Sequence, residues 1–159
     1  PPRMIRPVLA LAMLAGAGLA VPAGAASAKS GNAACKLTAK QVVERFIPLF
    51  YEQRNARQAF ETWVAEDYIQ HNPVAKDGRD NAIAALQPFF DSMPQLRYTV
   101  KMVIAEGDEV AVHNHLQMNA SDRGSAVVDI FRVDKCKIVE HWDVIQAIPE
   151  KSANAHPMF

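Results

Sequence analysis

Apolar residues recur at helical spacing in the part of the chain that follows Thr38. The residue type at Thr38 favours the start of a helix, and the apolar positions three or four residues apart after it predict an amphipathic helix. Pro48 lies inside this pattern and predicts a kink. Residues 56–69 continue as a second short helix, and residues 81–94 form a third. Residues 70–80 carry Asn-Pro and Asp-Gly pairs, which are typical of a loop.

The second half of the chain changes to a period of two. Residues 96–107 alternate, with Tyr98, Val100, Met102 and Ile104 expected on one face. Three further strands are predicted, over residues 109–119, 126–133 and 137–148. Helices followed by an antiparallel meander of about four strands predict an α+β fold, with the helices covering one face of the sheet. Nothing in the pattern indicates a second domain.

The N-terminal residues read as a secretory signal peptide. Two arginines precede an apolar run over residues 8–21, and the sequence PAGAASA follows with small-residue cleavage sites after Ala25 or Ala28. The predicted organisation is a signal peptide over 1–28, an arm over 29–37 and a domain over 38–159. The alternative is an uncleaved anchor, although the run is short for a membrane span. Cleavage predicts a periplasmic or secreted protein without membrane contact.

The charge and the cysteine content indicate which binding partners and which covalent cross-links the protein has. The formal net charge is zero and no run of like charges stands out, which argues against a nucleic-acid-binding surface. Cys35 and Cys136 are the two cysteines, and export favours a disulfide between them over two free thiols. The closed loop of about 100 residues is worth roughly 4–5 kcal/mol on the chain-entropy model.

Polar residues stand where a strand would carry apolar ones. Asp129 interrupts the strand AVVDIFRV, and His141 and Asp143 share one face of the last strand, opposite Trp142, Val144 and Ile138. A carboxylate and an imidazole in one cavity can perform general acid–base catalysis, because burial brings both pKa values nearer to neutrality. The alternative for Asp129 is a purely hydrogen-bonding role.

Three other histidines have two interpretations each. His113 and His115 share one strand face, which is either a pocket wall or the solvent face of the sheet. His71, in the sequence QHNP, is either a site residue or a residue that fixes a turn. The segment GDEVAVHNH begins like a cupin metal motif, but the positions that should supply a third ligand hold Asn119 and Ala120. No metal is therefore expected, and no nucleophile or nucleotide-binding motif is present, so no cofactor is expected.

Several motifs together resemble the SnoaL-like polyketide cyclase family of the nuclear-transport-factor-2-like superfamily. They are YIQHNP, GDEVAVH and DIFRVDKCKIVEHWDVIQAIP, and the resemblance spans roughly residues 38–159. It implies a cone-shaped α+β fold, in which a curved antiparallel sheet of about four to six strands wraps three N-terminal helices around a deep apolar pocket. It also implies frequent homodimerisation through the outer sheet face. Cys136 stands where the family commonly has glycine.

The resemblance also implies an activity, namely cofactor-free acid–base chemistry on a small carbonyl-bearing apolar molecule by a cyclase, isomerase or aldol-type lyase. Asp143 corresponds to the acid/base carboxylate, and Asp129 and His71 complete the expected catalytic set. The expected substrate contacts are His113, His115, His141, Trp63, Phe50 and Phe90. The alternatives are a non-catalytic binding protein of the same fold and a dimerising accessory domain without a ligand, because a fold does not fix a function.

Overall fold

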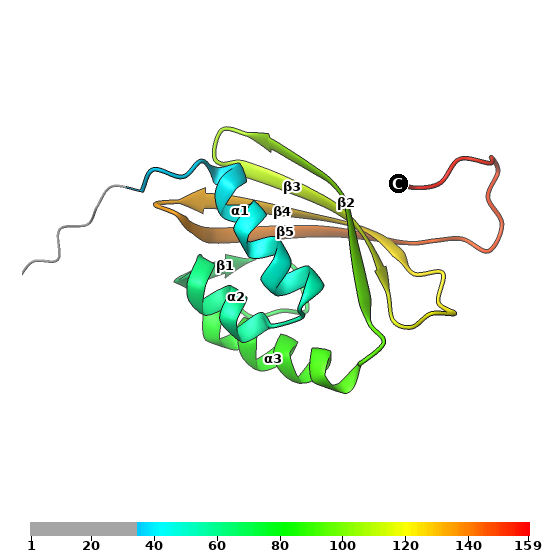
Figure 1. Ribbon diagram of the computed structural model, residues 1–159, viewed down its shortest axis with the longest axis horizontal. Helices are drawn as coiled ribbons and strands as arrows, with labels where there is room; N and C mark the ends of the chain where they lie inside the picture. Colours follow the sequence, from blue (N-terminus) through cyan, green and yellow to red (C-terminus); the bar gives the residue numbers. More distant parts are fainter. Residues whose placement is uncertain (1–34) are drawn as a thin grey trace, which may run out of the picture. The chain divides into compact units, whose positions relative to one another are not determined.

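The computed structural model describes residues 35–159, so the predicted signal peptide lies outside the described residues. The described part contains three α-helices, one π-helical turn (η1) and five strands (Figure 1). None of its helices is long and apolar enough to cross a membrane. The elements in chain order are α1 (Ala39–Ile47), η1 (Pro48–Glu52), α2 (Ala56–Trp63), β1 (Val64–Gln70), α3 (Arg79–Ser92), β2 (Arg97–Glu106), β3 (Glu109–Gln117), β4 (Ser125–Asp134) and β5 (Lys137–Ala147).

The start and end of α1 follow from its sequence. The Thr38 hydroxyl accepts a hydrogen bond from the Gln41 N–H at 3.2 Å, and the Gln41 side-chain oxygen accepts one from the Thr38 N–H at 3.0 Å. This reciprocal pair satisfies two backbone donors at the helix start. The predicted interruption at Pro48 is confirmed, since α1 ends at Ile47 and the chain continues as the single turn η1.

The strand β1 is a difference from the sequence-based expectation, which placed residues 56–69 in one helix. The helix α2 ends at Trp63, and the next seven residues pair in parallel with β5. The buried residues of this strand, Val64 and Tyr68, are four positions apart. That spacing fits a helix and a strand equally well, so periodicity cannot separate them. The sheet is consequently mixed rather than wholly antiparallel.

The five strands form one sheet in the order β1-β5-β4-β3-β2. The predicted antiparallel meander from β2 to β5 is confirmed, as is the α+β class with a curved sheet. In Figure 1, α1 crosses the strands β3 to β5, whereas α2 and α3 lie near β1. The apolar core lies between these helices and one face of the sheet, which we call the inner face.

Two register shifts change which residues face the core. In β2 the shift between Val100 and Met102 turns Met102 and Ile104 outward, where they are 49% and 58% exposed. The prediction that they share a face with Tyr98 and Val100 is therefore wrong beyond Val100. In β5 a second shift places Ile138 in the core, although alternation predicted it on the opposite face.

The predicted disulfide between Cys35 and Cys136 is confirmed, with the two Cα atoms 5.7 Å apart. It joins the N-terminal arm to the two-residue turn between β4 and β5. Both turn residues, Lys135 and Cys136, have positive φ angles of 46° and 62°. This is the backbone of a tight hairpin turn that favours glycine or asparagine, so the cysteine occupies a conformationally costly position.

Candidate functional site

A cavity of about 610 Å³ lies between the inner face of the sheet and the helices, and we call it the central cavity. Most of its wall is aromatic or aliphatic, and its polar side chains come from β4, from β5, from α3 and from the end of β1 with the residues that follow. The aromatic wall includes Phe46, Phe50, Phe60, Tyr68, Tyr98 and Phe131. Its polar residues include Gln70, Asn72, Asp129, His141 and Asp143.

Strand register brings the ionisable residues together. Asp129 on β4 pairs directly with Asp143 on β5, and Phe131 pairs with His141. Because side chains alternate along a strand, residues 129, 141 and 143 all point to the inner face. Asp129, His141 and Asp143 therefore all line the central cavity.

Asp129 is held by three protein donors. Its Oδ2 accepts hydrogen bonds from the Tyr51 hydroxyl at 2.7 Å and from Asn114 Nδ2 at 2.9 Å, and its Oδ1 lies 3.0 Å from His141 Nε2. Burial raises the pKa of Tyr51 well above its usual value, and the charge of Asp129 raises it further. Tyr51 consequently stays protonated and remains a donor to the carboxylate.

His141 is oriented from its other side by Gln70. His141 Nδ1 lies 2.8 Å from Gln70 Oε1, which also accepts a hydrogen bond from the Asn72 backbone N–H at 3.0 Å. The backbone donor identifies this Gln70 atom as the oxygen, so Nδ1 carries a hydrogen. Nδ1 and Nε2 therefore both face oxygen atoms, and one hydrogen lies between Nε2 and Asp129 Oδ1.

Asp143 differs from Asp129 in its contacts. Its Oδ2 accepts a hydrogen bond from Asn72 Nδ2 at 2.7 Å, while its Oδ1 has no hydrogen-bond partner among the described residues. Asp143 thus presents one uncommitted carboxylate oxygen to the central cavity. An uncommitted oxygen is the requirement for a group that exchanges protons with a ligand.

Tyr68 supplies a neutral donor to the same cavity. Burial raises the pKa of its phenol, and the charges of Asp129 and Asp143 raise it further. The hydroxyl oxygen accepts a hydrogen bond from Gln70 Nε2 at 3.3 Å, and its own hydrogen has no acceptor among the described residues. That hydrogen is available to an oxygen of a bound molecule.

The same three ionisable residues form a set that could hold a metal ion. Each of Asp129, His141 and Asp143 offers one ligand atom, and these atoms lie within 4.8 Å of one another. The cupin-like segment of the sequence contains His113 and His115, which do not belong to this set.

His71 does not line the central cavity, and this corrects its expected catalytic position. Its Nε2 lies 2.7 Å from Glu140 Oε1, and its ring stacks on Trp142 with centroids 4.6 Å apart. Glu140 and Trp142 alternate with His141 and Asp143 along β5, so His71 lies on the outer face. Its neighbour Asn72, which the sequence analysis missed, faces the cavity instead.

His113 and His115 are also outside the central cavity. They pair with Val128 and Ala126 on β4, whereas the inner-facing Val112 pairs with Asp129. Both rings lie on the outer face beside the C-terminal Phe159, at centroid distances of 5.5 and 4.6 Å. The expectation that they contact substrate is therefore replaced by the alternative, an outer-face position.

The three aromatic residues that were predicted to contact substrate lie partly in the cavity wall and partly in the apolar core. Phe50 lines the central cavity, whereas Trp63 and Phe90 pack in the core without lining it. The sequence analysis missed the polar residues around Asp129, His141 and Asp143, namely Tyr51, Tyr68, Gln70, Asn72 and Asn114. Asn114 carried a usable signal, because it is a polar residue at a fully buried position of an alternating strand.

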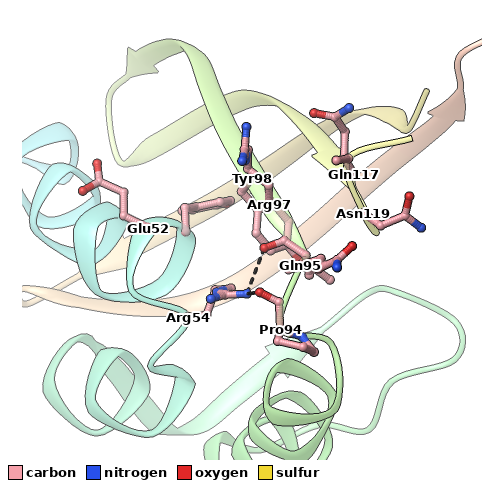
Figure 2. A pocket seen from close by; sticks show the side chains of 11 residues that line it. Glu52, Arg54, Pro94, Gln95, Arg97, Tyr98, Gln117 and Asn119 are labelled. Carbon is pink, nitrogen blue, oxygen red and sulfur yellow. Dashed lines mark hydrogen bonds between the residues drawn. The ribbon is translucent and has the colours of Figure 1, made fainter. Parts of the chain in front are cut away.

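A second hollow of about 660 Å³, which we call the polar groove, is shown in Figure 2. Arg54 lies on it in a left-handed conformation (φ 54°), and its Nη1 donates to the carbonyl oxygens of Met93, Pro94 and Leu96 at 2.9–3.3 Å. Arg54 therefore holds the turn before β2. Tyr98 lines both hollows, but the polar groove contains none of the clustered residues Asp129, His141 and Asp143. We therefore take the central cavity as the candidate functional site, because the acid–base groups line it.

Comparison with known proteins gives one family and many similar structures. Residues 43–141 match the model of the SnoaL-like domain. An NTF2-like protein of unknown function from Mesorhizobium loti shares 18% identity over 69% of this chain and 91% of its own, with a TM-score of 0.59. A SnoaL-like polyketide cyclase from Agrobacterium tumefaciens shares 14% identity over 69% and 92%, with a TM-score of 0.56. An NTF2-like protein of unknown function from Cytophaga hutchinsonii shares 18% over 70% and 93%, with a TM-score of 0.55. No curated protein matches the sequence.

Proposed function

Because this chain belongs to the SnoaL-like domain family, we propose that its central cavity binds a small, mostly apolar, carbonyl-bearing molecule and catalyses proton transfer on it without a cofactor. The observation that carries this proposal is the uncommitted Oδ1 of Asp143 in a cavity with a largely apolar wall. A general base needs such a position, close to the ligand and free of competing protein donors.

The proposed reaction uses Asp143 and Tyr68 in separate roles. Asp143 Oδ1 removes a proton from the carbon beside the carbonyl, and the electron pair moves onto the carbonyl oxygen to give an enolate. The Tyr68 hydroxyl donates its free hydrogen to that oxygen, which stabilises the developing charge. The enolate carbon then attacks a second carbonyl of the same molecule, which closes a ring, and the alkoxide oxygen formed takes the proton back from Asp143. In a conjugated substrate, the enolate instead takes that proton from Asp143 at a carbon further along the conjugated system, which moves the double bond.

Asp129 and His141 support this site without exchanging protons with the ligand. The oxygens of Asp129 and the nitrogens of His141 are already engaged by Tyr51, Asn114, Gln70 and each other. They hold a fixed arrangement of polar groups beside Asp143, and a rigid polar environment of this kind favours charge development in a transition state.

The test is exchange of ligand protons with solvent. A panel of small ketones and 1,3-diketones is incubated with the protein in D₂O, and loss of the protons beside the carbonyl is followed by NMR. Asp143→Asn is expected to lower the rate by about 10²–10⁴-fold, the usual contribution of a positioned general base. Asp67→Asn, at an exposed position of β1, is the matched control. An unchanged rate in Asp143→Asn removes Asp143 from this role.

A second candidate, a non-catalytic binding protein, is favoured by one observation. Most polar atoms of the cluster are bonded to one another, as a purely structural network would require. Native mass spectrometry of the purified protein distinguishes the two. A molecule that co-purifies and is released chemically unchanged after prolonged incubation supports binding alone.

The proposal places this protein in the periplasm or outside the cell. The disulfide between Cys35 and Cys136 supports this placement, because such bonds persist in oxidising compartments. The basic and apolar N-terminus supports export as well. Mass spectrometry of the exported protein is expected to find an N-terminus at Ala26 or Lys29; retention of residues 1–25 would contradict cleavage.

Homodimerisation through the outer sheet face is also proposed. Met102, Ile104 and Val144 are exposed there at 49%, 58% and 64%. The register places Met102, His113, Val128 and Val144 in one cross-strand row, so three of its four residues are apolar. Light scattering is expected to give twice the chain mass, and Ile104→Lys is expected to give a monomer.

A further inference from the structure

We propose that the ligand of the central cavity is an organic acid, and that Lys76 binds its carboxylate at the mouth of the cavity while its carbonyl lies at Asp143. This rests on the proposed function and adds the chemical class of the substrate. The side chains that support it, Lys76 and Asn81, line the cavity but take no part in the proposed proton transfer.

The central cavity has a buried inner end and an exposed mouth. Along β5, its lining residues pass from buried His141 through half-buried Asp143 to Ile145, which is 56% exposed. Val74 also lines the cavity and is 92% exposed. The mouth therefore lies between residues 74–76, the first half of α3 and the end of β5.

The acidic side chains of the cavity lie away from its mouth. Asp129 contacts the buried His141, and Asp143 is the direct cross-strand partner of Asp129. A ligand carboxylate beside Asp143 would be repelled, because like charges interact more strongly in protein surroundings than in water. An acidic ligand consequently binds with its carboxylate directed to the mouth and its carbonyl directed inward.

Lys76 is the charged side chain at the mouth. Its ammonium has no acidic partner among the described residues, since Asp77 accepts the Gln70 backbone N–H at 2.8 Å and Asp80 lies 3.5 Å from Arg79. An exposed lysine alone would be an ordinary solvated side chain. Lys76 differs because the other described residues that line the mouth are uncharged, so its charge is left to the ligand.

The segment that carries Lys76 is fixed to the sheet. The Gly78 N–H donates to the Tyr68 carbonyl at 2.7 Å, and Asp77 accepts from the Gln70 N–H. Gly78 has a φ of 93°, which a glycine adopts without strain. The backbone next to Lys76 is therefore held beside the cavity, and the side chain starts from a defined position.

Asn81 provides a neutral donor at the same mouth. Its Nδ2 donates one hydrogen to the Asp77 carbonyl oxygen at 2.8 Å, which identifies this atom as the nitrogen. The second hydrogen of Nδ2 has no acceptor among the described residues. A carboxylate has two oxygens and accepts from several donors, so one charged and one neutral donor suit it.

The experiment is an NMR titration with matched pairs of compounds. Phenyl ketones that carry a carboxylate at the end of a chain of two, three or four methylene groups are compared with their methyl esters. The members of a pair share the ring and the ketone and differ in charge. Lys76→Gln is expected to weaken binding of the best acid by about two- to fivefold, the usual range for an exposed ion pair, and to leave its ester unchanged. Lys76→Glu is expected to weaken the acid further.

The location of the ligand has its own readout and control. The side-chain amide signals of Asn81 and Asn72 should shift with the acid, because both residues line the cavity. Lys101, whose ammonium lies over the Phe159 ring, supplies the matched control Lys101→Gln. That variant removes the same charge from the outer face and is expected to bind acid and ester as wild type does. Raising the NaCl concentration should weaken the acid more than the ester.

The outcomes separate this proposal from the proposed function. Equal effects of Lys76→Gln on acid and ester, or failure of every acid to bind, overturn the carboxylate site. Esters that exchange their protons in D₂O would then still support proton transfer by Asp143. An acid that binds through Lys76 without exchanging protons supports the carboxylate site and contradicts the proposed proton transfer.

Discussion

Asp129 and Asp143 are direct cross-strand partners on β4 and β5, and both line the central cavity, yet only one of them has an uncommitted oxygen. Asp129 is engaged through both oxygens by Tyr51, Asn114 and His141. Asp143 is engaged through Oδ2 alone, by Asn72. Two identical side chains thus have different environments, one structural and one open to a ligand.

The first prediction follows from this difference. Asp129→Asn is expected to lower the free energy of unfolding by about 2–4 kcal/mol, because the amide disrupts a buried, charge-assisted network. Asp143→Asn is expected to lower the free energy of unfolding by less than about 1 kcal/mol, since its amide oxygen can still accept the hydrogen bond from Asn72. Urea unfolding of both variants measures the two costs. Equal costs would contradict the assigned division of roles.

The second prediction concerns alkaline pH. Burial is the first cause that raises the pKa values of Tyr51, Tyr68 and Tyr98, the three tyrosines of the chain, above the ordinary value of 10.0. In the unfolded chain they ionise near that value, so their contribution to stability is complete below pH 10.0 and decreases as the pH rises above it. Thermal unfolding should therefore move to lower temperature above pH 10.0.

The ultraviolet absorbance of tyrosinate provides the check. Its appearance should coincide with loss of the folded state, because none of the three phenols ionises readily while buried. A tyrosine that titrates near pH 10.0 in the folded protein would contradict the burial of these side chains.

The third prediction concerns Glu140 on the outer face. Its hydrogen bond from His71 lowers the pKa of the carboxyl, and the hydrogen bond from Arg132 lowers it further. A lowered pKa stabilises the folded state above the ordinary value of 4.5, and this contribution disappears as the pH falls through the folded-state value. Wild type should therefore be more stable than Glu140→Gln at neutral pH and lose that advantage below pH 4.5. An advantage that persists in acid would contradict the assignment.

Periodicity predicted the three helices and the meander, because apolar faces repeat locally along the chain. It could not predict the partners of the polar residues. Tyr51 meets Asp129 from 78 positions away, and Asn72 meets Asp143 from 71 positions away. The contact of Asn72 depends on the parallel pairing of β1 with β5, and the contact of Tyr51 depends on the packing of η1 against the sheet. No local pattern encodes either arrangement. For the same reason the sequence did not predict that His71 lies on the outer face while Asn72 faces the cavity. The two residues are neighbours in the chain, and their order alone does not determine the face on which each side chain lies.

The fourth prediction separates the disulfide from the turn that carries it. Cys35→Ser with Cys136→Ser is expected to lower the free energy of unfolding by roughly 4–5 kcal/mol on the chain-entropy model, for residues 101 positions apart. The double variant Cys35→Ser with Cys136→Gly should have a free energy of unfolding about 1 kcal/mol higher than Cys35→Ser with Cys136→Ser. The reason is that glycine adopts the left-handed conformation of the turn without strain. Denaturant unfolding measures both values. A glycine variant no more stable than the serine variant would contradict the assigned turn conformation.

The central claim is that the free oxygen of Asp143 moves protons on a ligand in the central cavity. The most direct measurement compares wild type, Asp143→Asn and Asp67→Asn by NMR, using the rate at which the best ketone of the panel exchanges its protons with D₂O. The account predicts equal rates for wild type and Asp67→Asn, and a rate about 10²–10⁴-fold lower for a folded Asp143→Asn. A folded Asp143→Asn that exchanges protons as fast as wild type would contradict it.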